Sequence, residues 1–330
     1  MPVPSQPLVS LQQVARYDLD LLRHALVELL APWGGMTGLL QSATNVQSPC
    51  VLLKPNLLTG ARPQNECTTR PELVRVVAEA VREAGGKPFI GDSPAFGSAY
   101  GVASQNGLVP ICEALDVPIV EFRGQRFNTP EGSTFEHLRL SREALGADVV
   151  INLPKVKSHM QLTVTLGVKN LFGCVPGKMK AWWHMEAGKD QLRFGKMLVE
   201  TALAIAPQLT IADGIIGHEG NGPSGGTPRP LGVLAASANV FALDRLLMEI
   251  LAVDPQTVPI YIAGRALGSM PEMGEIEIVG ANWQELRCED WQLPDRIVPI
   301  DFGAPRVLRS TLKHLLTLWS EARTLPSRRA

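Results

Sequence analysis

The sequence predicts an α/β fold: a mostly parallel sheet with helices on both faces, polar loops at the carboxyl ends of the strands and a C-terminal helical appendage. Two observations predict this class. Short apolar segments bounded by turn residues have the length of buried strands, and amphipathic helical patterns lie between several of them. Strands that alternate with helices are typical of βαβ units, in which helices cover both faces of a parallel sheet. The predicted strands are residues 50–55, 87–92, 117–122, 147–153, 209–214 and 232–239.

Two helices are predicted along this part of the chain. The clearer one covers residues 71–86, where apolar side chains recur at helical spacing. Thr69 and Glu72 have the spacing of a capping box at its start, and the pair Gly85–Gly86 supplies its stop. The second helix, residues 241–251, directly follows a predicted strand.

The C-terminal segment 307–324 has the pattern of a basic amphipathic helix. Such a helix can bind a membrane or a partner protein. A single apolar stripe more often faces the core of its own domain, so we expect this one to pack there. The residues of the stripe are Leu308, Leu312, Leu315 and Trp319.

No linker divides the chain into two autonomous halves. We expect residues 1–300 to form a single α/β domain with a large excursion at 154–208. Residues 301–330 should then form the C-terminal amphipathic helix and a tail.

Composition and charge exclude several classes of protein. The chain has 330 residues, a net charge of −1 and 19% charged residues, so it lacks the basic balance of a dedicated nucleic-acid-binding domain. No run reaches the roughly 18 apolar residues of a membrane-spanning helix. The N-terminus lacks the basic and apolar regions of a signal peptide. We therefore expect a cytoplasmic protein with no transmembrane segment and no nucleic-acid partner.

Polar residues collect where the predicted strands end. Ligands bind outside the carboxyl ends of the strands in open α/β sheets, so these positions mark a candidate site. Each segment also has a structural interpretation, such as an Asx turn for Asp92 or sharp turns for the glycines. Glycines can also let backbone N–H groups approach an anion. The residues concerned are Lys54, Asn56, Asp92, Ser93, Asp213, Glu219, Gly220 and Gly222.

Segment 154–173 is the densest in such residues and contains no acidic side chain. Its lysines suit a ligand that carries a carboxylate or a phosphate, and its histidine is a candidate general acid or base. The residues concerned are Lys155, Lys157, His159, Lys169 and Asn170. The following segment contains Trp182 and Trp183, which form either a lid that excludes water or anchors in the core.

Taken in chain order, five motifs resemble the domain of unknown function 362 family. They are KPN at 54–56, TTRPELV at 68–74, GDSP at 91–94, PKVKSH with VKNLFGCVPG at 154–177, and ADGIIGHEGNGPSGG at 212–226. The resemblance runs from about residue 48 to about residue 268 and implies one family domain whose biochemical role is not settled.

Many members of that family carry a ferredoxin-like segment with closely spaced cysteines. This chain departs from them, because its five cysteines lie far apart and no CxxC occurs. A [4Fe–4S] cluster needs four cysteine ligands. We therefore expect no self-encoded iron–sulfur cluster.

Three functions are compatible with these residues. The first is an enzyme that acts on an anionic small molecule, with the lysines binding its charge and His159, Asp92 and Asp213 as acid/base candidates. A divalent metal held by Glu219 with one of these aspartates would fit this function, because carboxylates suit Mg²⁺ or Mn²⁺. The second is a redox component that works with a separate ferredoxin or a bound cofactor. The third is a non-catalytic protein that binds an anionic ligand.

Overall fold

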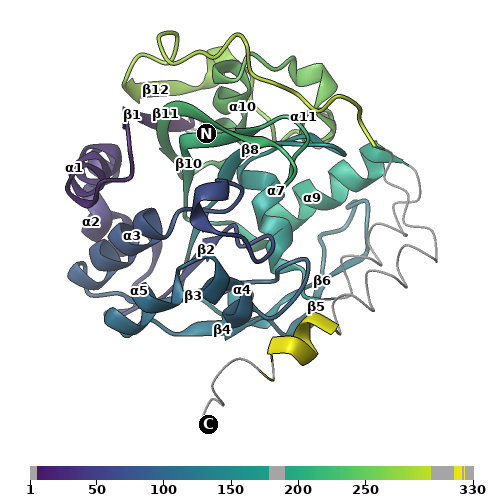
Figure 1. Ribbon diagram of the computed structural model, residues 1–330. Helices are drawn as coiled ribbons and strands as arrows, with labels where there is room; N and C mark the ends of the chain where they lie inside the picture. Colours follow the sequence, from purple (N-terminus) through teal and green to yellow (C-terminus); the bar gives the residue numbers. More distant parts are fainter. Residues whose placement is uncertain (1–5, 178–189, 299–315, 322, 324–330) are drawn as a thin grey trace.

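The computed structural model describes residues 6–177, 190–298, 316–321 and 323 (Figure 1). The described residues form a ten-stranded mixed sheet and a separate two-stranded ribbon, β5–β6. The strands are β1 (Leu8–Gln13), β2 (Cys50–Pro55), β3 (Lys87–Asp92), β4 (Ile119–Glu121), β5 (Gly124–Asn128), β6 (His137–Ser141), β7 (Val149–Leu153), β8 (Lys155–His159), β9 (Thr163–Thr165), β10 (Leu209–Glu219), β11 (Thr227–Ser237) and β12 (Glu277–Gly280).

The large sheet has the strand order β12-β1-β11-β10-β7-β2-β3-β4. The strands β4, β3, β2, β7 and β10 run parallel, as predicted. Strand β11 is antiparallel to both β10 and β1, and this makes the sheet mixed. Strand β8 pairs in parallel with β10 outside this order and forms an antiparallel pair with β9. The sheet is therefore mostly parallel.

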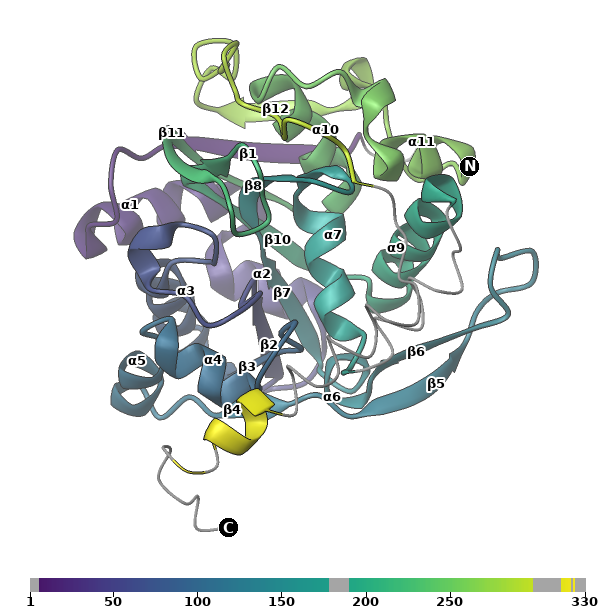
Figure 2. The ribbon, with the colours of Figure 1, turned by 45° about the vertical axis from the view of Figure 1, so that its right-hand side comes forward.

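Helices cover both faces of the sheet, as the sequence predicts (Figure 2). The apolar residues of α1 to α5 join one core, and those of α6, α7 and α9 to α11 join the other. The α-helices are α1 (Leu19–Leu30), α2 (Gly35–Ala43), α3 (Pro71–Glu83), α4 (Ala99–Gln105), α5 (Val109–Ala114), α6 (Arg142–Leu145), α7 (Gly167–Leu171), α9 (Gln191–Ile205), α10 (Val240–Ile250) and α11 (Pro259–Ala266). The 3₁₀ turns are η1 (Ala31–Trp33), η2 (Pro63–Asn65), η3 (Phe172–Cys174), η4 (Pro255–Thr257) and η5 (Met273–Glu275).

Successive side chains of a strand point to opposite faces of the sheet, and this determines which layer of helices each polar side chain faces. On β2, Val51 and Leu53 join the core under α1 and α3, whereas Leu52 joins the core under α7 and α9. Successive strand residues point to opposite faces, so Lys54 follows Leu52 toward α7. On β10, Asp213 follows Ile211 toward the layer of α1 and α3 by the same rule.

The predicted strands are confirmed, with changes in length. Strands 50–55 and 87–92 match β2 and β3 in full. Strand 209–214 is only the first half of β10, because the chain continues in an extended hairpin to β11. The excursion at 154–208 contains β8, β9, α7 and α9 among its described residues.

The capping box predicted for the start of α3 is wrong. Arg70 is the N-cap residue and its side chain does not cap the helix. The Thr69 hydroxyl instead accepts a hydrogen bond from the Asn56 N–H at 2.8 Å and donates to the Leu153 carbonyl at 2.6 Å. Thr69 therefore connects the ends of β2 and β7. Its hydroxyl makes these long-range hydrogen bonds and does not cap α3.

The C-terminal segment is helical over residues 316–321, as predicted. Its Glu321 carboxylate is buried and accepts hydrogen bonds from the Ser98 backbone N–H at 3.0 Å and from the Ser98 hydroxyl at 2.7 Å. Leu316 and Trp319 are each 56% exposed. The other three residues of the predicted apolar stripe lie outside the described residues. Among the helices that the structure describes, none combines the length and apolar character needed to cross a membrane.

Candidate functional site

Lys54 and Asp92 meet where the parallel strands β2 and β3 end. The Lys54 ammonium is fully buried and donates to Asp92 Oδ1 at 2.9 Å. It also donates to the Pro55 carbonyl at 3.1 Å and to Asn170 Oδ1 at 3.4 Å. Asp92 additionally accepts from the backbone N–H of Leu57 at 2.9 Å. A buried charge is stable only when it is paired and hydrogen-bonded, and both members of this pair meet that condition.

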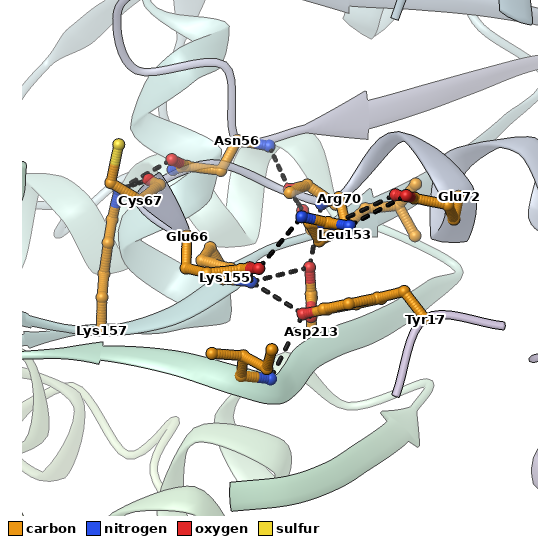
Figure 3. A network of polar contacts seen from close by, with 12 residues as sticks. Tyr17, Asn56, Glu66, Cys67, Arg70, Glu72, Leu153, Lys155, Lys157 and Asp213 are labelled. Carbon is orange, nitrogen blue, oxygen red and sulfur yellow. Dashed lines mark hydrogen bonds and ion pairs between the residues drawn. The ribbon is translucent and has the colours of Figure 1, made fainter. Parts of the chain in front are cut away.

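Lys155 forms a second ion pair on the other side of the sheet end (Figure 3). It lies on β8 in register with Asp213 of β10, and its ammonium reaches Asp213 Oδ2 at 3.3 Å. The ammonium also donates to Glu66 Oε2 at 2.7 Å and to the Tyr17 hydroxyl at 2.8 Å. The Tyr17 hydroxyl in turn donates to Asp213 Oδ1.

Burial and the two carboxylates around Lys155 change the acidity of its neighbours. Burial raises the pKa of Glu66, and the ammonium of Lys155 only partly opposes this effect. Burial, reinforced by the negative charge of Asp213, raises the pKa of Tyr17 well above its usual value. The Tyr17 hydroxyl therefore stays protonated and acts as a hydrogen-bond donor to Asp213.

Arg70, the residue before α3, contacts the residues around Lys155. Its guanidinium forms ion pairs with Glu66 at 3.1 Å and with Glu72 at 2.9 Å. The guanidinium carbon also lies 4.6 Å from the centre of the Tyr17 ring, within the range of a cation–π contact. Its backbone N–H donates to Asp213 Oδ2 at 3.0 Å.

Lys157 lies between these groups and differs from both other lysines. Its side chain is 0% exposed, and its ammonium donates to Asn56 Oδ1 at 2.9 Å and to the Cys67 carbonyl at 2.6 Å. Among the ion pairs of the described residues, none includes Lys157. Burial, together with the positive charges of Lys155 and Lys54, lowers its pKa to about 7, although the negative charge of Asp92 opposes this shift. Lys157 is therefore a buried amine that has hydrogen-bond acceptors but no counter-charge.

Two asparagines link Lys157 to Lys54 through hydrogen bonds. Asn56 accepts from Lys157 and donates through Nδ2 to Asn170 Oδ1 at 2.8 Å. Asn170 donates in turn to Asn152 Oδ1 at 2.8 Å and to the Lys54 carbonyl at 3.2 Å. Some of the predicted residues are therefore brought together: hydrogen bonds link Lys54, Asn56, Asp92, Lys157 and Asn170, and Lys155 and Asp213 form an ion pair. We call these two groups together the lysine site; it comprises Lys54, Lys155, Lys157, Asn56, Glu66, Asp92, Asn170 and Asp213.

Three further candidates, His159, Ser93 and Lys169, make other contacts. His159 ends β8 and is 8% exposed, and its Nδ1 accepts from the Gln161 N–H at 3.1 Å. Ser93 accepts from the Gly177 N–H at 3.0 Å through its hydroxyl. Lys169 is half-buried and lies 4.5 Å from the centre of the Phe172 ring. The roles predicted for these side chains stay predictions.

The candidates at the end of β10 contact other parts of the chain. Glu219 accepts from the Gln292 N–H at 3.0 Å and lies 3.8 Å from Arg229. Gly220 has a φ of 80°. A Cβ atom at Gly222 would lie 1.9 Å from the carbonyl oxygen of Ser158, so this position admits only glycine. The positive φ of Gly220 and the close approach at Gly222 therefore explain why glycine occupies these positions. The role in anion binding predicted for both stays a prediction.

The described residues contain no cluster of three or more histidine, cysteine, aspartate or glutamate side chains that could hold a metal ion. Asp92 and Asp213 face ammonium groups, and Glu219 faces a backbone N–H and a guanidinium. The five cysteines are free thiols, and Cys50 is the exposed one. The divalent-metal hypothesis and the expected absence of a self-encoded iron–sulfur cluster stay predictions. Trp182 and Trp183 lie outside the described residues.

Several residues of the site were missed by the sequence analysis. Tyr17 reaches Asp213 across 196 positions, and no local pattern marks it. Glu66 and Arg70 lie just before a predicted helix, where charged residues are common. His218 lies inside the glycine-rich motif, is 2% exposed and accepts from the Gly226 N–H at 3.0 Å through Nε2. Its position beside Lys157 follows only from the pairing of β8 with β10.

Comparison with known proteins decides the family. Residues 51–249 match the family described as Domain of unknown function (DUF362). The chain belongs to the DUF362 family. The resemblance seen in the sequence motifs is thereby confirmed. A curated relative, the thylakoid-associated protein sll1697 of Synechocystis sp. (strain ATCC 27184 / PCC 6803 / Kazusa), is 60% identical over 306 residues, which are 93% of this chain and 94% of that protein.

A solved structure also resembles this DUF362 protein. It is the lactate racemase apoprotein from Thermoanaerobacterium thermosaccharolyticum, with 13% sequence identity and a TM-score of 0.45. The match covers 74% of this chain but only 58% of the racemase chain.

Proposed function

We propose that this DUF362 protein is an enzyme that binds an anionic small molecule, a carboxylate or a phosphate, at the lysine site and performs acid/base chemistry on it. One observation carries the proposal. Lys157 is a fully buried amine that no described carboxylate neutralises, whereas Lys54 and Lys155 have carboxylate partners. Burying an unpaired charge is costly, so a protein that retains one gains when an anion binds there.

The position of Lys157 also suits proton transfer. A general acid or base works best when its pKa lies near the working pH, and burial brings the pKa of Lys157 to about 7. Asn56 and the Cys67 carbonyl fix the direction of the amine by accepting two of its N–H bonds. Lys54 and Lys155 are held in place by carboxylates, which balance their charges. In this proposal His159 remains the second candidate for proton transfer.

The experiment that tests the proposal compares metabolite pools. Purified protein is incubated with a deproteinated cell extract, and mass spectrometry follows which anionic metabolites are consumed. We expect the wild type to consume at least one carboxylate or phosphate that Lys157→Met leaves intact. Lys87→Met, the same substitution at an exposed lysine of β3, should behave as the wild type. Equal consumption by wild type and Lys157→Met would reject the lysine site as the active site.

The same samples separate the two other functions. An anion that copurifies with the protein but is never consumed favours a non-catalytic binding protein. A visible absorption band in the purified protein favours a redox component with a bound cofactor or a ferredoxin partner. Both remain alternatives to the enzyme.

A second candidate function is attachment to a membrane surface. The relative named thylakoid-associated is 60% identical, and the C-terminal segment of this chain leaves Leu316 and Trp319 each 56% exposed. Flotation with vesicles that contain an anionic lipid tests this candidate on the full chain. The wild type should float, the double variant Leu316→Glu/Trp319→Glu should not, and Val27→Glu, a change at an exposed residue of α1, should float as the wild type does. Flotation of the double variant would exclude this attachment.

A further inference from the structure

Lys157, which has no ion-pair partner among the described residues, has a neighbour with an unpartnered ring nitrogen. His218 lies on β10 in register with Lys157 on β8, and the two strands are parallel. Residues paired in this way point to the same face of a sheet, so the two side chains are neighbours. His218 is 2% exposed, and its Nδ1 atom makes no hydrogen bond. Unpaired buried polar groups of this kind are rare and call for an explanation.

The hydrogen bonds of the His218 ring determine which nitrogen carries the proton. The Gly226 N–H donates to Nε2, so Nε2 is the acceptor and a neutral ring carries its proton on Nδ1. Burial, together with the positive charges of Lys157 and Lys155, lowers the pKa of His218 to about 4, and a contact with the Asn65 backbone opposes this shift. At neutral pH the ring is therefore neutral. The unpartnered atom is an N–H donor.

An ammonium without an ion-pair partner and an imidazole N–H that makes no hydrogen bond within the described chain lie next to each other on paired strands. Both groups would be satisfied by a single anionic oxygen, or by the two oxygens of one carboxylate. A cation would be repelled by Lys157, and an apolar group would leave both donors unpaired.

The charges around the pair limit the charge of the anion. Lys54 is balanced by Asp92, and Lys155 faces both Glu66 and Asp213. Lys157 thus offers one positive charge without a described carboxylate partner, whereas Lys54 and Lys155 already have theirs. A second negative charge on the ligand would be buried without a partner and would weaken binding.

We propose that Lys157 and His218 together bind a monocarboxylate, with the carboxylate oxygens between the Lys157 ammonium and the His218 Nδ1–H group. This inference rests on the proposed function and narrows its substrate class from anions in general to monocarboxylates. Because both side chains are buried, the anion reaches them only when the surrounding chain opens. His218 binds the ligand as a neutral donor, and the proton that accompanies the anion goes to Lys157.

Calorimetric titration with two small probes tests the inference. Acetate and inorganic phosphate are titrated at about pH 7.5 and matched ionic strength, where phosphate is largely a dianion. We expect acetate to bind more tightly than phosphate. His218→Phe keeps an aromatic ring but removes both nitrogens. It should weaken acetate binding by about tenfold to a hundredfold, which corresponds to the loss of one hydrogen bond to a charged group. His137→Phe, at an exposed histidine of β6, should have no effect.

A second variant separates binding from folding. The amide of His218→Gln can accept from Gly226 and donate to the ligand, so it should restore much of the acetate affinity. The inference would be overturned if phosphate bound more tightly than acetate, or if His218→Phe bound acetate as well as the wild type does. The proposed function would still stand in that case, provided that Lys157→Met abolishes anion binding. If neither probe binds to the wild type, both the inference and the proposed function fail.

Discussion

A single amine decides the chemistry of the lysine site. Lys54, Lys155 and Lys157 are all fully buried, but only Lys157 is bound solely by neutral acceptors, the Asn56 amide and the Cys67 carbonyl. Water cannot stabilise its charge, and the two nearby ammonium groups oppose it. The consequence is an amine that exchanges its proton near neutral pH, some three pH units below an exposed lysine.

This shift makes the stability of the folded protein depend on pH. The folded protein releases the Lys157 proton near pH 7, whereas the unfolded chain keeps it until about pH 10. Between these values the unfolded state binds more protons, so the free energy of unfolding rises with pH, by up to about 1.4 kcal/mol per pH unit from this group. Below pH 7 both states are protonated and the contribution is constant.

Lys157→Met should remove this contribution and leave the protein folded, because it replaces an unpaired buried charge with an apolar side chain of similar length. Urea unfolding of wild type and variant at about pH 7.5, 8.5 and 9.5 measures it. We expect the wild type to gain stability relative to Lys157→Met as the pH rises. A difference between the two proteins that stays constant over this range, or that falls, would show that Lys157 keeps its proton in the folded protein.

The residues of the site were only partly predictable from the sequence. Lys54, Asp92, Lys155 and Asp213 were found because they follow apolar runs that end a strand. Tyr17 and His218 were not, since each takes its place through a long-range pairing: Tyr17 contacts Asp213 from a segment before α1, and His218 lies beside Lys157 through the β8–β10 register. Local patterns contain no information about such partners.

At the scale of the elements, the backbone after α7 comes unusually close to the lysine site. Gly173, in the short 3₁₀ turn η3, accepts from the Ser93 N–H at 3.1 Å. A Cβ atom added there would lie 2.0 Å from Asp92 Oδ1 and 2.4 Å from Lys54 Nζ. Glycine is therefore required by packing against an ion pair, not by backbone conformation.

Gly173→Ala should displace one member of the Lys54–Asp92 pair and destabilise the protein by about 1–3 kcal/mol, the usual cost of overpacking. Chemical denaturation measures the change. Gly274→Ala is the matched control, because a Cβ atom at Gly274 would meet no atom within 4 Å. If Gly173→Ala is as stable as the control, the ion pair tolerates movement and is not rigidly packed.

The order of the strands was also only partly predictable. The parallel strands β2, β3, β4 and β7 were predicted as such because each is a short apolar run between turns. Strand β1 and strand β12 were missed, although they pair with each other from opposite ends of the described chain. The edge strand β12 has no fully buried residue, and this weakens the apolar signal on which strand prediction depends.

For the whole molecule, this pairing joins the N-terminal and C-terminal parts of the sheet. Strand β1 lies between β11 and β12, so one continuous sheet runs through the predicted domain of residues 1–300. We expect a single cooperative unfolding transition in urea, with the same midpoint by far-ultraviolet circular dichroism and by tryptophan fluorescence. Two separate transitions would show that the chain contains two independently stable units.

The central claim is that an anion binds at Lys157 and brings a proton with it. At about pH 8 the amine is mostly neutral in the empty protein, because its pKa is about 7. A bound anion restores the charge, so binding must be coupled to proton uptake. The most direct test is a pH-stat titration of the unbuffered protein with acetate. The wild type should take up close to one proton per bound acetate, and Lys157→Met should take up none; acetate binding without proton uptake in the wild type would contradict the claim.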